Sequence, residues 1–110
     1  MPDIERLVAE SDTMYPALFQ LCGGYFHQDW RSEHADSAAA IAAFKVEVPS
    51  DAVRDAVSEI DRILSAGFDE DDLAALINDG FDCSYVPPRE GVTYAAWLAS
   101  IRDALLRESA

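Results

Sequence analysis

The sequence predicts an all-α protein, a single compact bundle of about five helices formed by residues 1–110. Half of the residues are hydrophobic, which is enough to build a core in one domain of this length. Ala, Leu, Asp and Glu are abundant while β-branched residues are sparse, and this composition favours helices over strands. Apolar residues also recur at helical spacings of three and four between capping and stop signals.

The first predicted helix follows a short, charged start to the chain. Residues 1–12 carry few apolar side chains and predict one short helical turn or a loosely held arm. From residue 13 or 14 onwards, apolar residues repeat on one face as far as Phe26. The pair Gly23-Gly24 weakens the end of this helix, because each glycine costs about 1 kcal/mol against alanine in a helix interior. It indicates either close approach by another element or a bend.

The second and third predicted helices are separated by a proline. Ser32 is placed to cap the second helix, whose many alanines indicate tight packing against a neighbour until Pro49 ends it. Ser50 is placed to cap the third helix, and Gly67 supplies its C-terminal stop. The third helix has the clearest apolar stripe, formed by Val53, Val57, Ile60 and Leu64.

The last two predicted helices flank an extended loop. Asp69 is placed to cap the fourth helix, which Gly80 ends. The loop, residues 81–92, contains two adjacent prolines and a glycine. Thr93 is placed to cap the fifth helix, where the spacing of apolar residues predicts that Trp97 packs in the core.

The densest run of special chemistry is Gly-Gly-Tyr-Phe-His-Gln-Asp-Trp, at residues 23–30. Its large rings can anchor a core, and its polar groups need partners wherever they become buried. The main interpretation is structural: the run ends the first helix and fixes the turn into the second. The residues of this structural motif are Tyr25, Phe26, His27, Gln28, Asp29 and Trp30.

The same run allows a catalytic alternative, in which His27 acts as a general base oriented by Asp29. His27, Asp29 and His34 also resemble a metal site, to which Glu33 or Asp36 could add an oxygen, so a small metal-dependent enzyme is a further alternative. However, these residues are divided between a turn and a helix, and the chain lacks a phosphate loop, a nucleophile elbow and a cysteine-histidine ligand set. We therefore expect no catalysis, no metal and no cofactor.

Charge is the strongest global feature, with 21 acidic against 8 basic residues and a net charge of −13. Such a charge argues against binding to nucleic acid or to an anionic membrane and favours a basic protein partner. Cys22 and Cys83 are too few for a disulfide scaffold and are expected to be reduced and packed. Without a signal-like start or a long apolar run, a cytoplasmic location is expected.

The acidic residues concentrate in two groups. Asp51, Asp55 and Glu59 stand at successive i, i+4 positions, where like charges cost about 0.2–0.5 kcal/mol per pair. A solvated face explains this row as well as a binding face does. The second group would stabilise the start of the fourth helix in any case. It consists of Asp69, Glu70, Asp71 and Asp72. We predict that both groups contribute to one acidic binding surface, with exposed Tyr85 or Tyr15 as apolar anchors.

Several segments together carry a family resemblance. Tyr15-Pro-Ala-Leu-Phe-Gln, followed by the run at residues 23–30, is similar to the pattern Y-x-x-L-x-x-F-x-G-x-Y-F-H-Q-D-W that opens immunity proteins of contact-dependent growth inhibition systems. The helix at 48–64, the stop at Gly67, the proline pair and the Thr-Tyr-Ala-Ala-Trp-Leu run at 93–98 follow in the order expected for that family. Cys22 departs from the pattern, which has another apolar residue there, and this affects packing.

The resemblance implies an immunity protein that binds and neutralises a cognate toxin domain delivered by a neighbouring cell. Many such toxins are nucleases, and a nuclease site must be positive to hold phosphates, so an acidic surface fits this partner. Inhibition at the active site and at an exosite both remain open. We expect a monomer, because the sequence shows no clear unpaired apolar face. The alternative is a small acidic helical adaptor or regulator unrelated to toxins.

Overall fold

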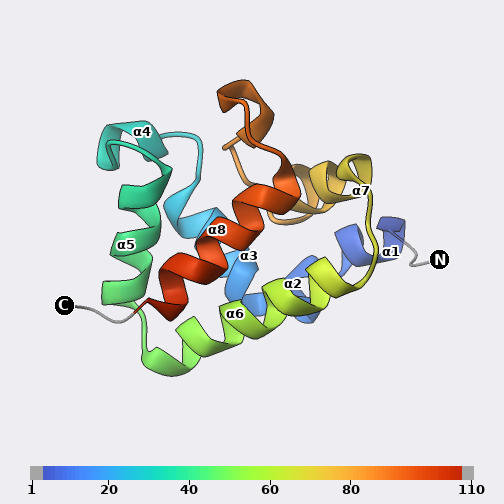
Figure 1. Ribbon diagram of the computed structural model, residues 1–110, viewed down its shortest axis with the longest axis horizontal. Coiled ribbons are helices and arrows are strands. Elements are labelled where there is room, and N and C mark those ends of the chain that lie inside the picture. Colours follow the sequence, from blue (N-terminus) through green and yellow to red (C-terminus); the bar gives the residue numbers. More distant parts are fainter. Residues whose placement is uncertain (1–3, 108–110) are drawn as a thin grey trace.

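In the computed structural model, which describes residues 4–107, the chain folds into helices that pack around one core (Figure 1). The four longer helices are α3 (Pro16–Tyr25), α5 (Ser37–Glu47), α6 (Ser50–Ser65) and α8 (Tyr94–Leu106). The four shorter ones are α1 (Ile4–Ala9), α2 (Ser11–Met14), α4 (Trp30–Glu33) and α7 (Glu70–Ala74). A π-helical segment, η1 (Ala75–Gly80), continues α7, and a 3-10 segment, η2 (Pro87–Glu90), precedes α8. The described residues contain no strand, so the predicted all-α class is confirmed.

The five predicted helices correspond to α3, α5, α6, α7 with η1, and α8. The short helices add to this set: α1 and α2 lie before α3, where a helical turn or an arm is predicted, and α4 lies between α3 and α5. None of the described helices has the length and apolar character needed to cross a lipid bilayer.

Two predicted capping residues hold the starts of their helices. The Asp69 carboxylate accepts a hydrogen bond from the Asp72 main-chain N–H at 2.8 Å, at the start of α7. The Thr93 hydroxyl accepts one from the Ala96 N–H at 3.0 Å, at the start of α8. These local signals therefore act as side-chain caps.

Helix α5 begins later than predicted. The residue that caps it is Asp36, whose carboxylate accepts a hydrogen bond from the Ala39 N–H at 2.8 Å. Ser32 lies instead within α4, where its hydroxyl donates to the Asp29 carbonyl at 2.7 Å. The chain needs this extra turn because Trp30, at the start of α4, is buried in the core before α5 begins.

Helix α6 starts without the predicted side-chain cap and ends where the sequence predicts. It starts at Ser50, directly after Pro49, and no side chain caps its first turn, so the cap predicted at Ser50 is wrong. It ends at Ser65, and Gly67 follows with φ of +80°. Because glycine adopts this left-handed conformation without steric cost, the predicted stop is confirmed.

The glycine pair at 23–24 does not mark a close approach. A Cβ added to Gly23 or Gly24 would meet no atom within 4 Å, and both residues are exposed on α3. The close approach occurs at Gly80, where a Cβ would lie 3.3 Å from the Ser11 Cβ and 3.4 Å from the Val8 Cα. The Ser11 hydroxyl also donates to the Gly80 carbonyl at 2.6 Å, so the N-terminal helices rest directly on η1.

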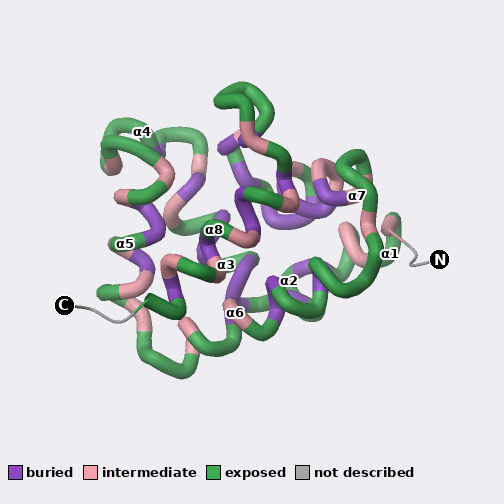
Figure 2. The backbone as a smooth tube through the Cα atoms, in the orientation of Figure 1, coloured by how far each residue is buried: buried purple, intermediate pink, exposed green. Residues whose placement is uncertain are grey.

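The centre of the core is an aromatic cluster contributed by four different parts of the chain. The Phe26 ring lies 5.2–5.6 Å, between centroids, from the rings of Trp30, Tyr85 and Trp97. Trp97 is therefore a core residue, as predicted, and its indole N–H donates to the Ser37 hydroxyl at 3.0 Å. Figure 2 shows buried residues, in purple, along α3 and α8 in the middle of the bundle. Both cysteines are free and buried, as expected.

Candidate functional site

Tyr25, the first residue of the motif at residues 25–30, joins the end of α3 to α5. Its hydroxyl donates to the Glu47 carboxylate at 2.6 Å, and its ring packs edge-on against Phe44. The other side of the ring stacks on His34, with centroids 6.0 Å apart. Burial and the Glu47 carboxylate raise the pKa of Tyr25 to about 12, which keeps the hydroxyl protonated as a donor.

Phe26 and Trp30 join the same turn to the loop before α8. The Phe26 carbonyl accepts a hydrogen bond from the Ser84 N–H at 2.7 Å, and both rings lie in the aromatic cluster. The Arg31 guanidinium lies over the Trp30 ring, 4.9 Å from its centroid, and also contacts Glu90 at 3.3 Å. These contacts favour the structural interpretation of the motif.

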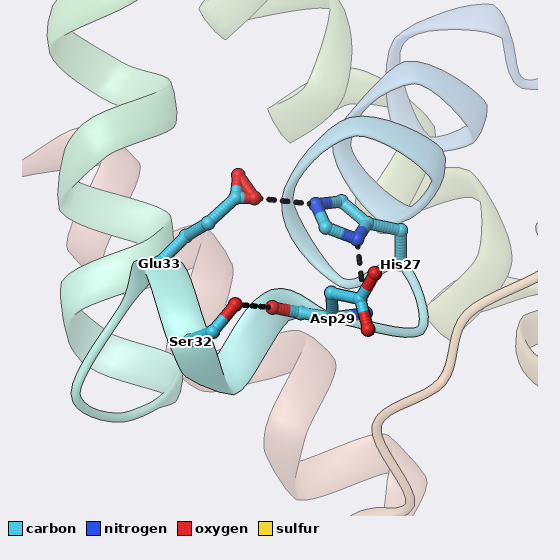
Figure 3. Close-up of polar contacts among 4 residues, drawn as sticks. All are labelled: His27, Asp29, Ser32 and Glu33. Atoms are coloured by element: carbon cyan, nitrogen blue, oxygen red, sulfur yellow. Dashed lines mark hydrogen bonds and ion pairs between the residues drawn. The ribbon is translucent and has the colours of Figure 1, made fainter.

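His27 has a different partner from the one predicted (Figure 3). Its Nε2 lies 2.8 Å from the Glu33 carboxylate, while its Nδ1 accepts a hydrogen bond from the Asp29 main-chain N–H at 3.1 Å. Since Nδ1 accepts, Nε2 carries the hydrogen and donates to Glu33. The bond from Asp29 comes from its main chain and not from its carboxylate, so the predicted arrangement of His27 oriented by the Asp29 carboxylate is not assembled.

The predicted metal-like group is also not assembled. His34 stacks on Tyr25 and does not join His27 and Asp29. Over residues 4–107, no three His, Cys, Asp or Glu side chains are grouped so that they could hold a metal ion. Gln28 and Asp29 are exposed at the tip of the turn, and their side chains have no hydrogen-bond partner within that range. The motif thus holds elements together, and its histidine pairs with Glu33 in place of the predicted Asp29.

The acidic row predicted on α6 is interrupted, because Glu59 is only 3% exposed. Its carboxylate accepts hydrogen bonds from the Ala17 N–H at 3.1 Å and the Leu18 N–H at 3.0 Å, in the first turn of α3. These N–H groups have no partner within α3, because they lie before its first hydrogen-bonded turn closes. Burial raises the pKa of Glu59, although both N–H groups and Arg62 favour its charged form. The prediction that Glu59 belongs to an exposed face is wrong.

The other two members of the row are exposed. Asp51 forms an ion pair with Arg54 on the same face of α6. The Asp55 carboxylate makes no hydrogen bond or ion pair with the part of the chain that the structure describes. Asp51 and Asp55 therefore leave a smaller acidic patch at the N-terminal half of α6.

Two of the four acidic residues around the start of α7 support helix termini. Asp69 caps its own helix, and the Glu70 carboxylate accepts hydrogen bonds from the Tyr94 N–H at 2.7 Å and the Ala95 N–H at 3.2 Å. Glu70 thus caps α8 from another helix, a role that sequence spacing does not reveal. Asp71 is exposed and Asp72 is half-buried.

The two acidic groups lie towards opposite ends of α6 (Figure 1). Asp51 and Asp55 are in its first half, whereas α7 begins after its last residue. At 1.5 Å per residue, the intervening helix separates the groups by roughly 20 Å. The two groups therefore form separate acidic patches in place of one continuous cluster.

The predicted aromatic anchors are both buried. Tyr85 is 4% and Tyr15 is 6% exposed. The Tyr85 hydroxyl donates to Glu90 at 2.7 Å, inside the turn that η2 forms before α8. Tyr15 packs edge-on against Phe81, with the Arg62 guanidinium 5.2 Å from its ring centroid. Neither ring is available as an exposed anchor, because each fills a space between two elements.

The structure contains an exposed apolar groove that the sequence reasoning missed. It lies between α5 and α8, has a volume of about 330 Å³ and is bordered by Lys45 and Arg107. Its apolar lining consists of Ala38, Ile41, Ala42, Val46 and Ala104. Val46 is 82% exposed, and Leu106, beside Arg107, is 54% exposed. The available signal was the i, i+4, i+8 spacing of Ala38, Ala42 and Val46, which places an apolar stripe on one face of α5.

Comparison with known proteins found a matching family model and similar solved structures. A family model described as CdiI immunity protein matches residues 14–105. A chain of the crystal structure of a CdiA-CT/CdiI complex from Y. kristensenii 33638 is similar, with a TM-score of 0.80 and 28% sequence identity. The similarity covers 84% of the present chain and 98% of that chain. A comparison with curated proteins gave no match.

Proposed function

Since the chain belongs to the CdiI immunity protein family, we propose that it binds and neutralises a cognate, nuclease-type toxin domain through an acidic surface. The match over residues 14–105 is the observation that carries this proposal. It is supported by the similar fold of a chain solved in a CdiA-CT/CdiI complex. On this proposal the protein acts as a monomer in the cytoplasm, where a delivered nuclease would meet its substrate.

The net charge of −13 supports a basic partner. A nuclease holds phosphates with cationic side chains, and carboxylates can occupy or border such a site in place of phosphates. The predicted residues that remain exposed or half-exposed for this role are Asp51, Asp55, Asp71 and Asp72. Asp69 and Glu70 contribute charge while they hold helix termini.

We assign inhibition to binding alone, without catalysis by this chain. The best-connected histidine, His27, is engaged by Glu33 and by the main chain of Asp29. Its surroundings include no nucleophile within hydrogen-bond reach, so the side chains offer contacts and charge in place of a reaction centre.

Co-expression tests the proposal. The C-terminal domain of the protein encoded directly upstream would be induced in a laboratory strain, with and without this chain. We expect the domain alone to arrest growth and the chain to restore it. In parallel, the purified domain should cleave RNA or DNA, and equimolar chain should stop the cleavage.

The negative control for rescue is an inactive mutant of this chain, for example one truncated within α8 so that the core cannot form. If the upstream domain is harmless, or if it arrests growth even when this chain is present, the proposed function is wrong. If the upstream domain is toxic and this chain neutralises it, but the domain cleaves neither RNA nor DNA, the immunity function stands and the nuclease assignment is wrong.

A further inference from the structure

Val46 and Leu106 stand out among the large apolar side chains that the structure describes. They are 82% and 54% exposed, whereas the other exposed large apolar residues, Met14, Phe19 and Leu64, are 37–39% exposed. A partner that covers such a side chain gains free energy, because apolar surface is removed from water. Exposed apolar groups gathered at one place typically mark an interaction site.

The groove between α5 and α8 includes Val46 in its lining, whereas Leu106 lies outside the lining and next to Arg107 in the chain. Ile41 in the lining of the groove is buried. Ala38 and Ala42 contribute only methyl groups, which leaves space above Ile41. The Lys45 ammonium donates to the Ala104 carbonyl at 3.2 Å and also to the Arg107 carbonyl. The two helices are thereby fixed to each other, and the groove is a preformed feature.

Carboxylates border this end of the molecule. Glu47 follows Val46 along the chain, and α6 then begins with the exposed Asp51 and Asp55. Figure 1 shows the ends of α5 and α8 and the start of α6 gathered at one end of the bundle, and Figure 2 shows these segments largely exposed. On α8, Asp103 is also exposed.

From these observations we propose that the groove between α5 and α8 is the apolar centre of the toxin interface, bordered by the acidic start of α6. This inference rests on the proposed function and specifies which surface performs it. An apolar side chain of the toxin enters the groove, while lysine or arginine side chains around it meet Asp51 and Asp55. Protein interfaces commonly combine such an apolar centre with a charged rim.

Charge complementarity favours this occupant over a second copy of the chain. Two chains that each carry −13 repel one another, whereas a cationic domain is attracted to the acidic border. Lys45 does not oppose a basic partner strongly, because its charge is engaged by carbonyls at the C-terminal end of α8. Arg107 is the remaining cation beside the groove.

Matched aspartate substitutions test the inference. Val46→Asp would be compared with Leu64→Asp, which places the same charge at another exposed apolar position, 37% exposed on α6. The probe is the toxin domain encoded directly upstream, and titration calorimetry gives Kd. We expect the Val46 variant to weaken binding by about tenfold or more and the control to change Kd by less than about twofold. Because aspartate adds favourable charge toward a basic partner, a loss must come from the apolar contact.

Thermal unfolding of each variant establishes that it is folded, and Ala42→Trp provides an independent block by filling the groove.

If wild-type chain binds the toxin while all groove variants bind as tightly, the interface lies elsewhere and this inference is wrong. If wild-type chain itself fails to bind, the proposed function fails with it. A dimer in sedimentation that Val46→Asp dissociates would assign the groove to a second copy. Arg107→Glu should bind the toxin domain more tightly, because it removes a positive charge beside the groove. If this variant binds more weakly, the occupant of the groove is acidic.

Discussion

The carboxylate of Glu59 lies against the first turn of α3 and accepts hydrogen bonds from the Ala17 and Leu18 N–H groups. It therefore joins the middle of α6 to the start of a helix more than 40 residues earlier. A residue that caps another helix in this way stabilises both the helix terminus and the packing of the two helices.

We expect Glu59→Ala to lower the free energy of unfolding by about 1–3 kcal/mol, because it leaves buried N–H donors without an acceptor. Glu59→Gln retains one acceptor oxygen and should cost less. Asp55→Ala, at an exposed position one turn earlier, should change stability by no more than about 0.5 kcal/mol. Urea unfolding followed by circular dichroism measures all three.

The same variants test the protonation of this carboxyl. Burial raises the pKa of Glu59 in the folded state, so the folded protein holds this proton more tightly than the unfolded chain does. The contribution of Glu59 to stability should therefore decrease as pH rises through the interval above its ordinary pKa. As pH rises from the ordinary value of 4.5, wild type should lose stability relative to Glu59→Gln. A constant difference would show that the N–H groups have cancelled the effect of burial.

Tyr85 and Glu59 explain why single candidate residues could not be selected from the sequence. Both fit a plausible exposed pattern, one as an aromatic residue in a loop and the other as an i+4 neighbour of Asp55. Their burial depends on where η2 and α3 lie in three dimensions, which no local spacing encodes. By contrast, Asp51 and Asp55 are exposed as predicted, because they lie on the polar face of a strongly amphipathic helix.

The helices differ in how far local signals determined their ends. Asp69, Thr93 and Gly67 act within one turn of their own helix, and each was predicted correctly. The start of α5 was misplaced, because the burial of Trp30 required an additional turn before Asp36 could cap it. Local caps are thus predictable from sequence, whereas boundaries set by tertiary packing are not.

Two glycine substitutions distinguish the effect of local helix propensity from the effect of packing between helices. Gly23→Ala should stabilise the protein by about 0.5–1 kcal/mol, because Gly23 is helical and exposed, and a methyl group added there would meet no atom within 4 Å. Gly80→Ala should destabilise it by about 1–3 kcal/mol, because its methyl group would press on Ser11 and the main chain of Val8.

Thermal unfolding of both variants provides the comparison, and each serves as the control for the other. If Gly23→Ala proves destabilising, an unrecognised contact or bend must exist at the end of α3. If Gly80→Ala is neutral, α1 and α2 are able to move away from η1 without loss of packing.

Across the protein surface, the location of negative charge should matter more than its total. We predict that Asp51→Lys with Asp55→Lys slows association with the toxin domain by about tenfold at low salt. Asp12→Lys with Asp79→Lys changes net charge equally at exposed positions in α2 and η1, and should have a smaller effect. Stopped-flow measurements give both rates.

The salt dependence completes this comparison. Association of the wild-type chain should slow as salt rises, because screening reduces attraction between exposed charges. The variant with lysine at 51 and 55 should show a flatter dependence. If both double variants slow association equally, net charge alone steers the encounter and the acidic start of α6 has no special position.

The aromatic cluster around Phe26 also determines what the protein emits when it is excited in the ultraviolet. Both tryptophans of the chain, Trp30 and Trp97, lie within this one cluster, so their fluorescence reports a single buried environment. The cluster joins segments that are up to 71 positions apart, from Phe26 to Trp97. A shift of the emission maximum to longer wavelength therefore signals that the two halves of the chain have separated, and no label is needed to observe it.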